Sequence, residues 1–231
     1  MTRGVLPLLL CLILCVPLTS QAVFTDNQLQ GELWMTLQPI LPQELERRAH
    51  DKEKLDALLK EMTAVFSGMI YGWSFDYRPI APDRNVPEKL DVVPLGHIVG
   101  TTGNVKTSRA WAWATHLNDE TGILVVDFRY IMTPFEVERR SAWASANMDT
   151  AVGRGRAPLV DRWESRLDAL HQALKDAVRN LLRPQYYNRP EEIRGEAILA
   201  QVPLYGVDSG QYTCSARFQI RIFKVRDYPS Q

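Results

Sequence analysis

Residues 211–225, the last apolar stretch of the chain, limit the possible folds more than any other segment. Apolar side chains occupy alternate positions, namely Tyr212, Cys214, Ala216, Phe218, Ile220 and Ile222. The positions between them are polar or charged: Thr213, Ser215, Arg217, Gln219 and Arg221. This alternation predicts a long β-strand with one buried and one solvated face. Because a sheet with one wet face is typically antiparallel and covered by helices on its other face, we expect an α+β fold.

The sequence also predicts amphipathic helices that could cover one face of such a sheet. Residues 43–67 form the first predicted helix, which is charged nearly all round in its first half. Its second half carries one apolar stripe, made of Leu55, Leu58, Leu59, Met62, Val65 and Phe66. The strongest helical pattern spans residues 158–183, where apolar residues step by three and four until Pro184. A third helix is expected over 133–147, because Thr133 and Glu136 form a capping box around Pro134.

The segment "YGWSFDYR" carries aromatic residues at every second position, which are Tyr71, Trp73, Phe75 and Tyr77. The alternation predicts a strand with Ser74, Asp76 and Arg78 facing water. The aromatic face could either pack under the helices or form a platform for a ligand. We favour the core, because large aromatic side chains dominate ordinary protein interiors.

Further strands are expected at residues 95–101, 108–117, 122–132 and 193–204. The second and third of these are joined by "NDETG", which indicates a hairpin. The segment 79–94 contains four prolines and is expected to be a loop, and "DTAVGRGRAP" (149–158) is also interpreted as a loop. The predicted fold is therefore an antiparallel sheet of about five or six strands, with two or three amphipathic helices packed on one face.

The first 22 residues are typical of a cleaved secretory signal peptide. Arg3 precedes an apolar run from Val5 to Leu18, and Ser20 and Ala22 supply the small residues of a cleavage site. The run is shorter than the roughly 18–20 apolar residues that a membrane span requires. Lipid attachment at Cys15 is disfavoured, because the residue before it, Leu14, is not small. Residues 23–231 would then form a single α+β domain.

The cysteine content and the net charge indicate in which cellular compartment the protein lies and which classes of partner it could bind. Removal of the signal peptide would leave Cys214 as the one cysteine, so no intramolecular disulfide is expected. The chain contains no Asn-x-Ser/Thr triplet, which favours a bacterial periplasm over a eukaryotic secretory route. Its 27 basic and 27 acidic residues balance, which gives no electrostatic case for binding nucleic acid.

The residue types that perform common chemistries do not form recognisable patterns. The four histidines, His50, His97, His116 and His171, lack a second ligand at a metal-binding spacing, so neither a metal nor a cofactor is predicted. Cys214 could act as a nucleophile with His116 as its base. A buried, inert cysteine on the core face of the last strand is the favoured alternative.

Two weak binding sites remain. "GRGR", which is Gly153, Arg154, Gly155 and Arg156, precedes a predicted helix and could bind a small anion, although a flexible basic loop is favoured. A cleft lined by Trp73, Trp111, Trp113 and Tyr130 could hold an apolar or sugar-like molecule. Arg217, Arg221 and Arg78 could form a basic patch if their strands are neighbours.

These observations favour a non-enzymatic envelope protein, periplasmic or secreted, that binds another envelope component through its open sheet face or its proline-rich loop. The alternative is a binder of an apolar or sugar-like small molecule. A hydrolase with widely scattered catalytic residues is a third, weaker hypothesis.

Overall fold

The computed structural model describes residues 27–36, 51–98, 105–114, 122–145, 148–159, 162–185 and 190–229. Strands predominate in these ranges, with three α-helices among them. In chain order the elements are β1 (Gln28–Thr36), α1 (Asp51–Ile70), β2 (Trp73–Arg78), a short 3-10 helix (Pro82–Arg84), β3 (Lys89–Pro94), β4 (Val105–Ala114), β5 (Gly122–Ile131), α2 (Pro134–Ser145), β6 (Asp149–Pro158), α3 (Arg162–Leu182), β7 (Glu192–Leu199), β8 (Leu204–Asp208) and β9 (Gln211–Arg226).

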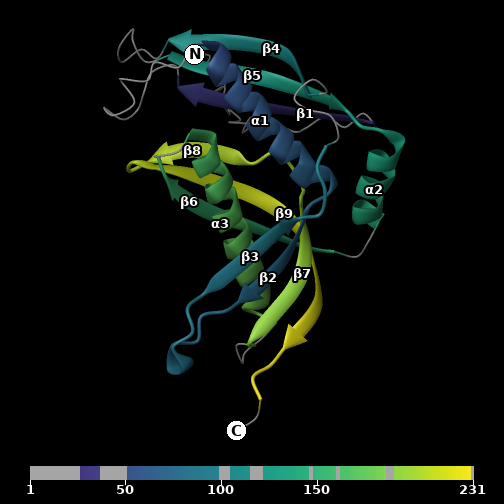
Figure 1. Ribbon diagram of the computed structural model, residues 1–231, viewed down its shortest axis with the longest axis vertical. Helices are drawn as coiled ribbons and strands as arrows, with labels where there is room; N and C mark the ends of the chain where they lie inside the picture. Colours follow the sequence, from purple (N-terminus) through teal and green to yellow (C-terminus); the bar gives the residue numbers. More distant parts are fainter. Residues whose placement is uncertain are drawn as a thin grey trace, which may run out of the picture.

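The larger sheet is six-stranded and antiparallel, with the order β3-β2-β7-β9-β6 and with β8 paired to β9. The long strand β9 organises it. The first half of β9 lies between β6 and β8, and its second half pairs with β7. Helix α3 packs along β6 and β9 (Figure 1). We call the face of this sheet opposite α3 the open face.

The smaller sheet has three strands in the order β1-β5-β4 and lies at the opposite end of the molecule from the C-terminus (Figure 1). Helix α1 contacts β1 and β5 of this sheet and also β7 of the larger one. As a result both sheets and α1 share one apolar core, in which Phe66, Phe128 and Phe218 are buried. The predicted α+β class is confirmed. The sequence analysis predicted one sheet, and the structure has a second, smaller one.

The aromatic stripe is buried, as predicted. Tyr71, Trp73, Phe75 and Tyr77 are between 3% and 8% exposed. The Trp73 ring meets Phe218 of β9 edge-on, with ring centroids 6.5 Å apart, and meets His171 of α3 in the same way at 6.3 Å. The aromatic side chains therefore fill the space between the larger sheet and its helices.

The interpretation of residues 149–158 as a loop was wrong, because they form strand β6 at the edge of the larger sheet. Small residues face α3 on alternate positions, and an added Cβ on Gly153 would lie 1.9 Å from the carbonyl oxygen of Ala173. The corresponding distance from Gly155 to Ala169 is also 1.9 Å. Glycine is present here because the helix backbone approaches the strand closely, which a sequence pattern alone does not reveal.

Three other segments differ from the sequence-based expectations. Residues 89–94 of the proline-rich segment form β3, an edge strand, a position where proline is tolerated. Residues 95–98 do not form a strand, and the rest of that predicted strand lies outside the described residues. Residues 28–36, which carried no clear signal, form β1 against β5.

Several local predictions are confirmed. The capping box of α2 is present, since the Thr133 amide donates to Glu136 Oε2 at 2.8 Å and the Glu136 amide donates to Thr133 Oγ1 at 3.3 Å. β4 and β5 pair as an antiparallel hairpin. The predicted signal peptide and the charged first part of the first helix lie outside the described residues.

Candidate functional site

Trp73 and Tyr130, two of the four aromatic residues proposed to line a cleft, do not lie at a surface. Trp73 lies on β2 and Tyr130 on β5, in different sheets, and both are buried in the shared core. The Tyr130 hydroxyl donates to Glu136 Oε1 and Oε2, each at 2.9 Å, and burial raises the pKa of this phenol. Trp111 and Trp113 lie on β4, but their side chains are outside the described part of the structure.

The "GRGR" residues divide between the two faces of the larger sheet. Gly153 and Gly155 face α3, and Arg154 and Arg156 point to the open face, where both are exposed. A hollow of about 500 Å³ opens there. We call it the open-face hollow, and it is lined by Arg154, Gly155, Arg156, Leu204, Tyr205, Gly206, Thr213, Cys214 and Ser215.

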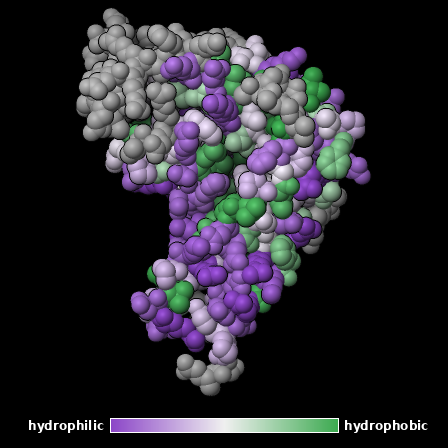
Figure 2. Space-filling model, viewed as in Figure 1, coloured by the Kyte–Doolittle hydropathy of each residue, from purple (hydrophilic) through white to green (hydrophobic). Residues whose placement is uncertain are grey.

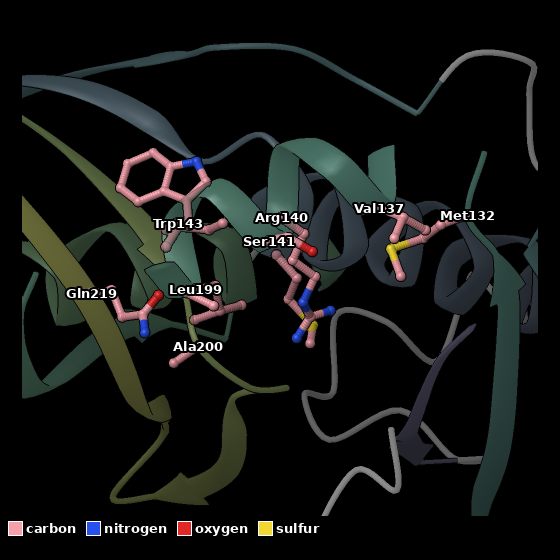
Figure 3. A pocket seen from close by; sticks show the side chains of 11 residues that line it. Met132, Val137, Arg140, Ser141, Trp143, Leu199, Ala200 and Gln219 are labelled. Atoms are coloured by element: carbon pink, nitrogen blue, oxygen red, sulfur yellow. The ribbon is translucent and has the colours of Figure 1, made fainter. Parts of the chain in front are cut away.

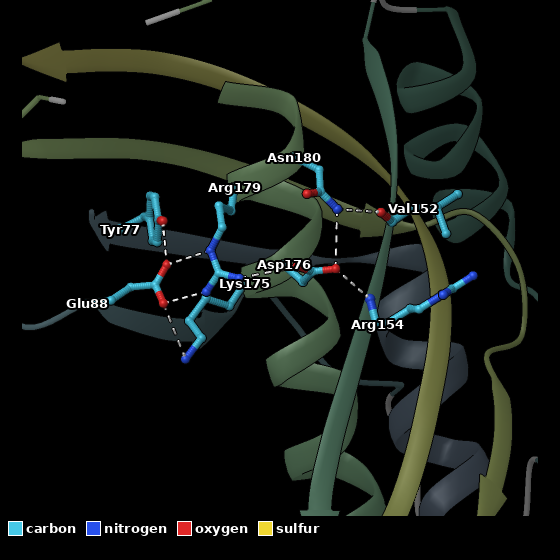
Figure 4. A network of polar contacts seen from close by, with 8 residues as sticks. All are labelled: Tyr77, Glu88, Val152, Arg154, Lys175, Asp176, Arg179 and Asn180. Carbon is cyan, nitrogen blue, oxygen red and sulfur yellow. Dashed lines mark hydrogen bonds and ion pairs between the residues drawn. The ribbon is translucent and has the colours of Figure 1, made fainter. Parts of the chain in front are cut away.

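The backbone of "GRGR" is not available to an anion in the way that the sequence suggested. The Arg154 amide donates to Asp176 Oδ2 of α3 at 3.0 Å, and Asn180 Nδ2 donates to the Val152 carbonyl at 3.3 Å (Figure 4). These two side chains occupy the outer edge of β6, which an extended peptide could otherwise pair with. Any contribution to anion binding must therefore come from the arginine side chains.

Unpaired positive charge gathers around the open-face hollow. Arg156 forms an ion pair with Asp208 at 3.0 Å. Arg154 and Arg217, which are diagonal neighbours on β6 and β9, make no ion pair with an acidic side chain among the described residues. Apolar side chains flank them, with Val152 48% and Leu204 66% exposed.

In the other half of the open face, three arginines pair with neighbouring acidic side chains. Arg194 pairs with Asp76 at 3.2 Å and with Glu192 at 2.6 Å. The further pairs in this ion-pair ladder are Arg221 with Glu196, and Arg226 with Glu191 and Glu192. The expected patch of Arg217, Arg221 and Arg78 does not form as one unit, because β7 lies between β9 and β2, which carries Arg78, and because Arg221 pairs with Glu196.

A second polar network joins the helix α3 to the strands β2 and β3. Glu88 accepts hydrogen bonds from the Tyr77 hydroxyl at 2.6 Å and from Arg179 Nε at 2.9 Å (Figure 4). Burial opposes the charge of Glu88, but the hydrogen bonds from Arg179 and Tyr77 lower its pKa overall. In the view of Figure 2, hydrophilic side chains cover the surface over α3 and the β2–β3 hairpin. This network fixes α3 to the far edge of the sheet.

A buried ion pair lies in the core and was missed by sequence reasoning. Glu61 of α1 is 0% exposed and Arg166 of α3 is 2% exposed, and Arg166 Nε lies 3.0 Å from Glu61 Oε1. Arg166 Nη1 also donates to the Trp34 carbonyl at 2.6 Å, and its guanidinium lies 4.4 Å from the centre of the Tyr205 ring. The available signal was position, because both charges fall within the apolar stripes of their helices.

Cys214 is buried in the core, as the favoured alternative predicted. It is a free thiol and 2% exposed. Burial raises the pKa of this thiol to about 12, with Arg166 lowering it and Glu61 raising it. Its proposed base, His116, lies outside the described residues. A thiol with such a pKa is almost wholly protonated near neutral pH and is a poor nucleophile.

The two described histidines, His97 and His171, do not gather into a site, and His50 lies outside the described residues. His97 is exposed, and His171 packs against Trp73, where burial lowers its pKa in spite of Asp168. In the described ranges, no group of three or more His, Cys, Asp or Glu side chains is arranged to hold a metal ion. No described helix combines the length and apolar character of a membrane span.

Comparison with known proteins places the chain in a family. The model of an uncharacterised protein family matches residues 17–228, which is most of the sequence. The chain belongs to this family. A protein of Treponema pallidum (strain Nichols), described as an uncharacterized protein, is 21% identical over 213 residues, covering 89% of this chain and 87% of that relative. No solved structure matches the chain.

Proposed function

We propose that the protein is a non-enzymatic binding protein of the bacterial envelope, and that its open-face hollow binds an acidic segment of another envelope protein. The observation that carries this proposal is the pair of arginines, Arg154 and Arg217, that lack an acidic partner among the described residues. Exposed Leu204 and Val152 beside them offer apolar contact. Such a surface complements a chain that mixes carboxylates with apolar residues.

The contrast within the open face supports an acidic partner. The ion-pair ladder already satisfies its arginines with carboxylates from the same sheet. A partner carboxylate at the hollow would instead meet a guanidinium that has no competing acid, and such charge-assisted hydrogen bonds are among the stronger ones. Complementary charge also favours the correct partner and speeds its association.

A binding role without catalysis is supported by the state of Cys214. The residue that sequence reasoning considered as a nucleophile is buried, and its pKa is raised. The side chains that line the hollow include two arginines, a leucine, a tyrosine and two hydroxyl residues, which are suited to recognition. Export to the periplasm is proposed from the apolar run and cleavage motif of residues 1–22.

The partner site can be tested by photocrosslinking in cells of the native bacterium. A photoreactive amino acid at Leu204 should give a specific adduct, and the same amino acid at Ile131, which is 63% exposed on the smaller sheet, should not. Reversing the charge of both Arg154 and Arg217 to glutamate should abolish the adduct. Mutating Arg221, which already pairs with Glu196, to glutamine is the matched control and should preserve it.

Two results would contradict the proposal. One is an adduct that forms equally from position 131. The other is an adduct that survives the charge reversal, which would show that the arginines do not recognise the partner. The intact mass of the exported protein tests its export and processing. A chain beginning at or near Val23 is expected. A mass that matches a diacylated chain beginning at Cys15 would contradict cleavage before Val23.

A further inference from the structure

The larger sheet has three edge strands, and they differ in how far a further strand could pair with them. At the β6 edge, Asp176 and Asn180 of α3 bind the backbone of the strand. The β3 strand ends in Pro94, and proline cannot donate to a neighbouring strand. By contrast β8, with the sequence LYGVD, contains no proline, and no side chain of a described residue binds its backbone. β8 is therefore the edge of this sheet on which a further strand can form.

The turn that joins β8 to β9 determines which backbone groups of β8 point outward. Ser209 and Gly210 both have positive φ, 50° and 73°, as in a two-residue type I′ turn. In such a hairpin the last residue of the first strand, here Asp208, forms a hydrogen-bonded pair with the first residue of the next strand. Every second residue of β8 is therefore bonded to β9, and the N–H and C=O groups of Tyr205 and Val207 point to the free edge.

The side chains of β8 divide between the two faces of the sheet. Leu204 and Gly206 line the open-face hollow, while Tyr205 packs against the Arg166 guanidinium of α3. Val207, on the same face as Tyr205, is 41% exposed. A strand added to this edge has one face beside the hollow and the other beside an exposed apolar side chain.

Arginine side chains of β6 reach across the sheet as far as β8. Arg156 Nη2 lies 3.0 Å from Asp208 Oδ2, although β9 separates the two strands. Arg154 is in register with Ser215 of β9, which is in register with Leu204 of β8. The Arg154 guanidinium can therefore extend in the same direction, toward an acidic side chain on a strand next to Leu204.

A second hollow, of about 380 Å³, lies beside α2 and offers no such edge. Its walls include Met132, Trp143 and Leu199 (Figure 3). The strand residues among its walls belong to β7 and β9, each of which is paired on both sides within the larger sheet. An extended segment therefore finds unpaired backbone groups next to the open-face hollow and not beside α2.

We propose that the acidic segment of the partner binds as an additional strand on the free edge of β8. This inference rests on the proposed function and specifies how the partner is held. Hydrogen bonds with the backbone of Tyr205 and Val207 supply affinity, and alternate side chains supply specificity. On the open face the segment carries acidic residues, which meet Arg154 and Arg217, and on the other face it carries apolar residues beside Val207. The segment is therefore an extended chain in which acidic and apolar residues alternate.

A labelled peptide of about six residues in which glutamate and valine alternate tests the proposal, through its fluorescence polarisation with the full-length mature protein. It should bind more tightly than a peptide of the same composition whose glutamates and valines stand in two blocks. Val207→Pro should weaken binding at least about fivefold, because an outward donor is lost while the bonds to β9 are kept. Val207→Thr, which keeps the N–H and the branched shape, is the matched control and should bind within about twofold of the wild type.

Amide hydrogen exchange, measured by NMR on the wild-type protein, keeps the test decisive if Val207→Pro does not fold. The alternating peptide should slow exchange of the Tyr205 and Val207 amides, which point outward. The Gly206 amide, which is bonded to β9, is the internal control and should change little. Failure of the alternating peptide to bind, undiminished binding by Val207→Pro, or unchanged exchange at both outward amides would each overturn the proposal.

Failure of strand addition can be distinguished from failure of the proposed function by the photocrosslinking experiment at Leu204. If Arg154→Glu with Arg217→Glu abolishes the adduct but Val207→Pro leaves it intact, the hollow recognises its partner through side chains and strand addition is excluded. If no specific adduct forms from Leu204 in the otherwise unchanged protein, the proposed function itself fails, whatever the peptide does.

Discussion

The two faces of the larger sheet are built from the same strands, but one is packed against a helix and the other is exposed to solvent. On the face covered by α3, Gly153 has no room for a methyl group and Phe218 is fully buried. On the open face, their neighbours Arg154 and Arg217 are exposed. The comparison shows that one residue step along a strand changes the environment from close-packed interior to solvent. The covered face therefore holds the close-packed side chains, and the open face carries the exposed arginines.

Two arginines give the sharpest test of this difference. Arg166→Ala should destabilise the protein by about 3–5 kcal/mol, because it leaves Glu61 buried without its partner. Arg156→Ala, which removes the exposed pair with Asp208, should cost no more than about 1 kcal/mol. Denaturant melts of both variants supply the two values. Equal losses of unfolding free energy in the two variants would show that a buried ion pair contributes no more to stability than an exposed one.

Trp73 and Ser74 test the same contrast with neighbouring residues of β2. Trp73→Ala should cost about 3–5 kcal/mol, because a large aromatic side chain is lost from a packed interior against Phe218. Ser74→Ala should change the free energy of unfolding by within about 0.5 kcal/mol. Urea unfolding followed by circular dichroism provides both numbers. A nearly neutral Trp73→Ala would mean that the aromatic stripe is not a core element.

Gly153 tests how closely α3 approaches the sheet. Gly153→Ala should destabilise by about 1–3 kcal/mol, since the added methyl group meets the Ala173 carbonyl and the helix must shift. Val152→Ala, one residue away on the open face, is the control and should cost within about 0.5 kcal/mol. A stabilising effect of Gly153→Ala would contradict the packing described here.

The buried ion pair should also make stability depend on pH. Burial raises the pKa of Glu61 from 4.5 to about 7, with Arg166 opposing that rise. A group whose pKa is raised on folding contributes stability below its unfolded pKa, and this contribution is lost as the pH rises through the folded value. Wild-type stability should therefore contain a component that falls between about pH 4.5 and pH 7. The Glu61→Gln variant should lack that component, and Glu164→Gln, at an exposed position, should keep it.

The smallest expected effect concerns Cys214. Reductant should leave the thermal midpoint of the mature protein unchanged, because the described thiol is free and buried. A clear fall in the midpoint of the monomer on adding reductant would reveal a crosslink. Thiol-specific labelling should likewise be slow until the protein unfolds, because the protonated thiol reacts poorly.

Most of the features that could be predicted from the sequence followed from alternation in strands and from helical spacing. The pattern of residues 211–225 specified β9 and its two faces, the capping box specified the start of α2, and the aromatic stripe specified β2 and its burial. These features depend on neighbours in sequence, so local periodicity is enough to find them. The buried state of Cys214 followed from the same alternation.

The tertiary structure alone decided the features that depend on distant partners. Residues 149–158 look like a loop until Ala169 and Ala173 of α3 bring a helix backbone against their glycines. Glu61 and Arg166 fall within the apolar stripes of their helices, but only the meeting of α1 and α3 in the core pairs them. The proposed binding site on the open face also combines residues far apart in the chain, because strand order, not periodicity, brings Arg154 beside Arg217. Alternation assigns a side chain to a face, but only the folded chain determines what lies opposite it.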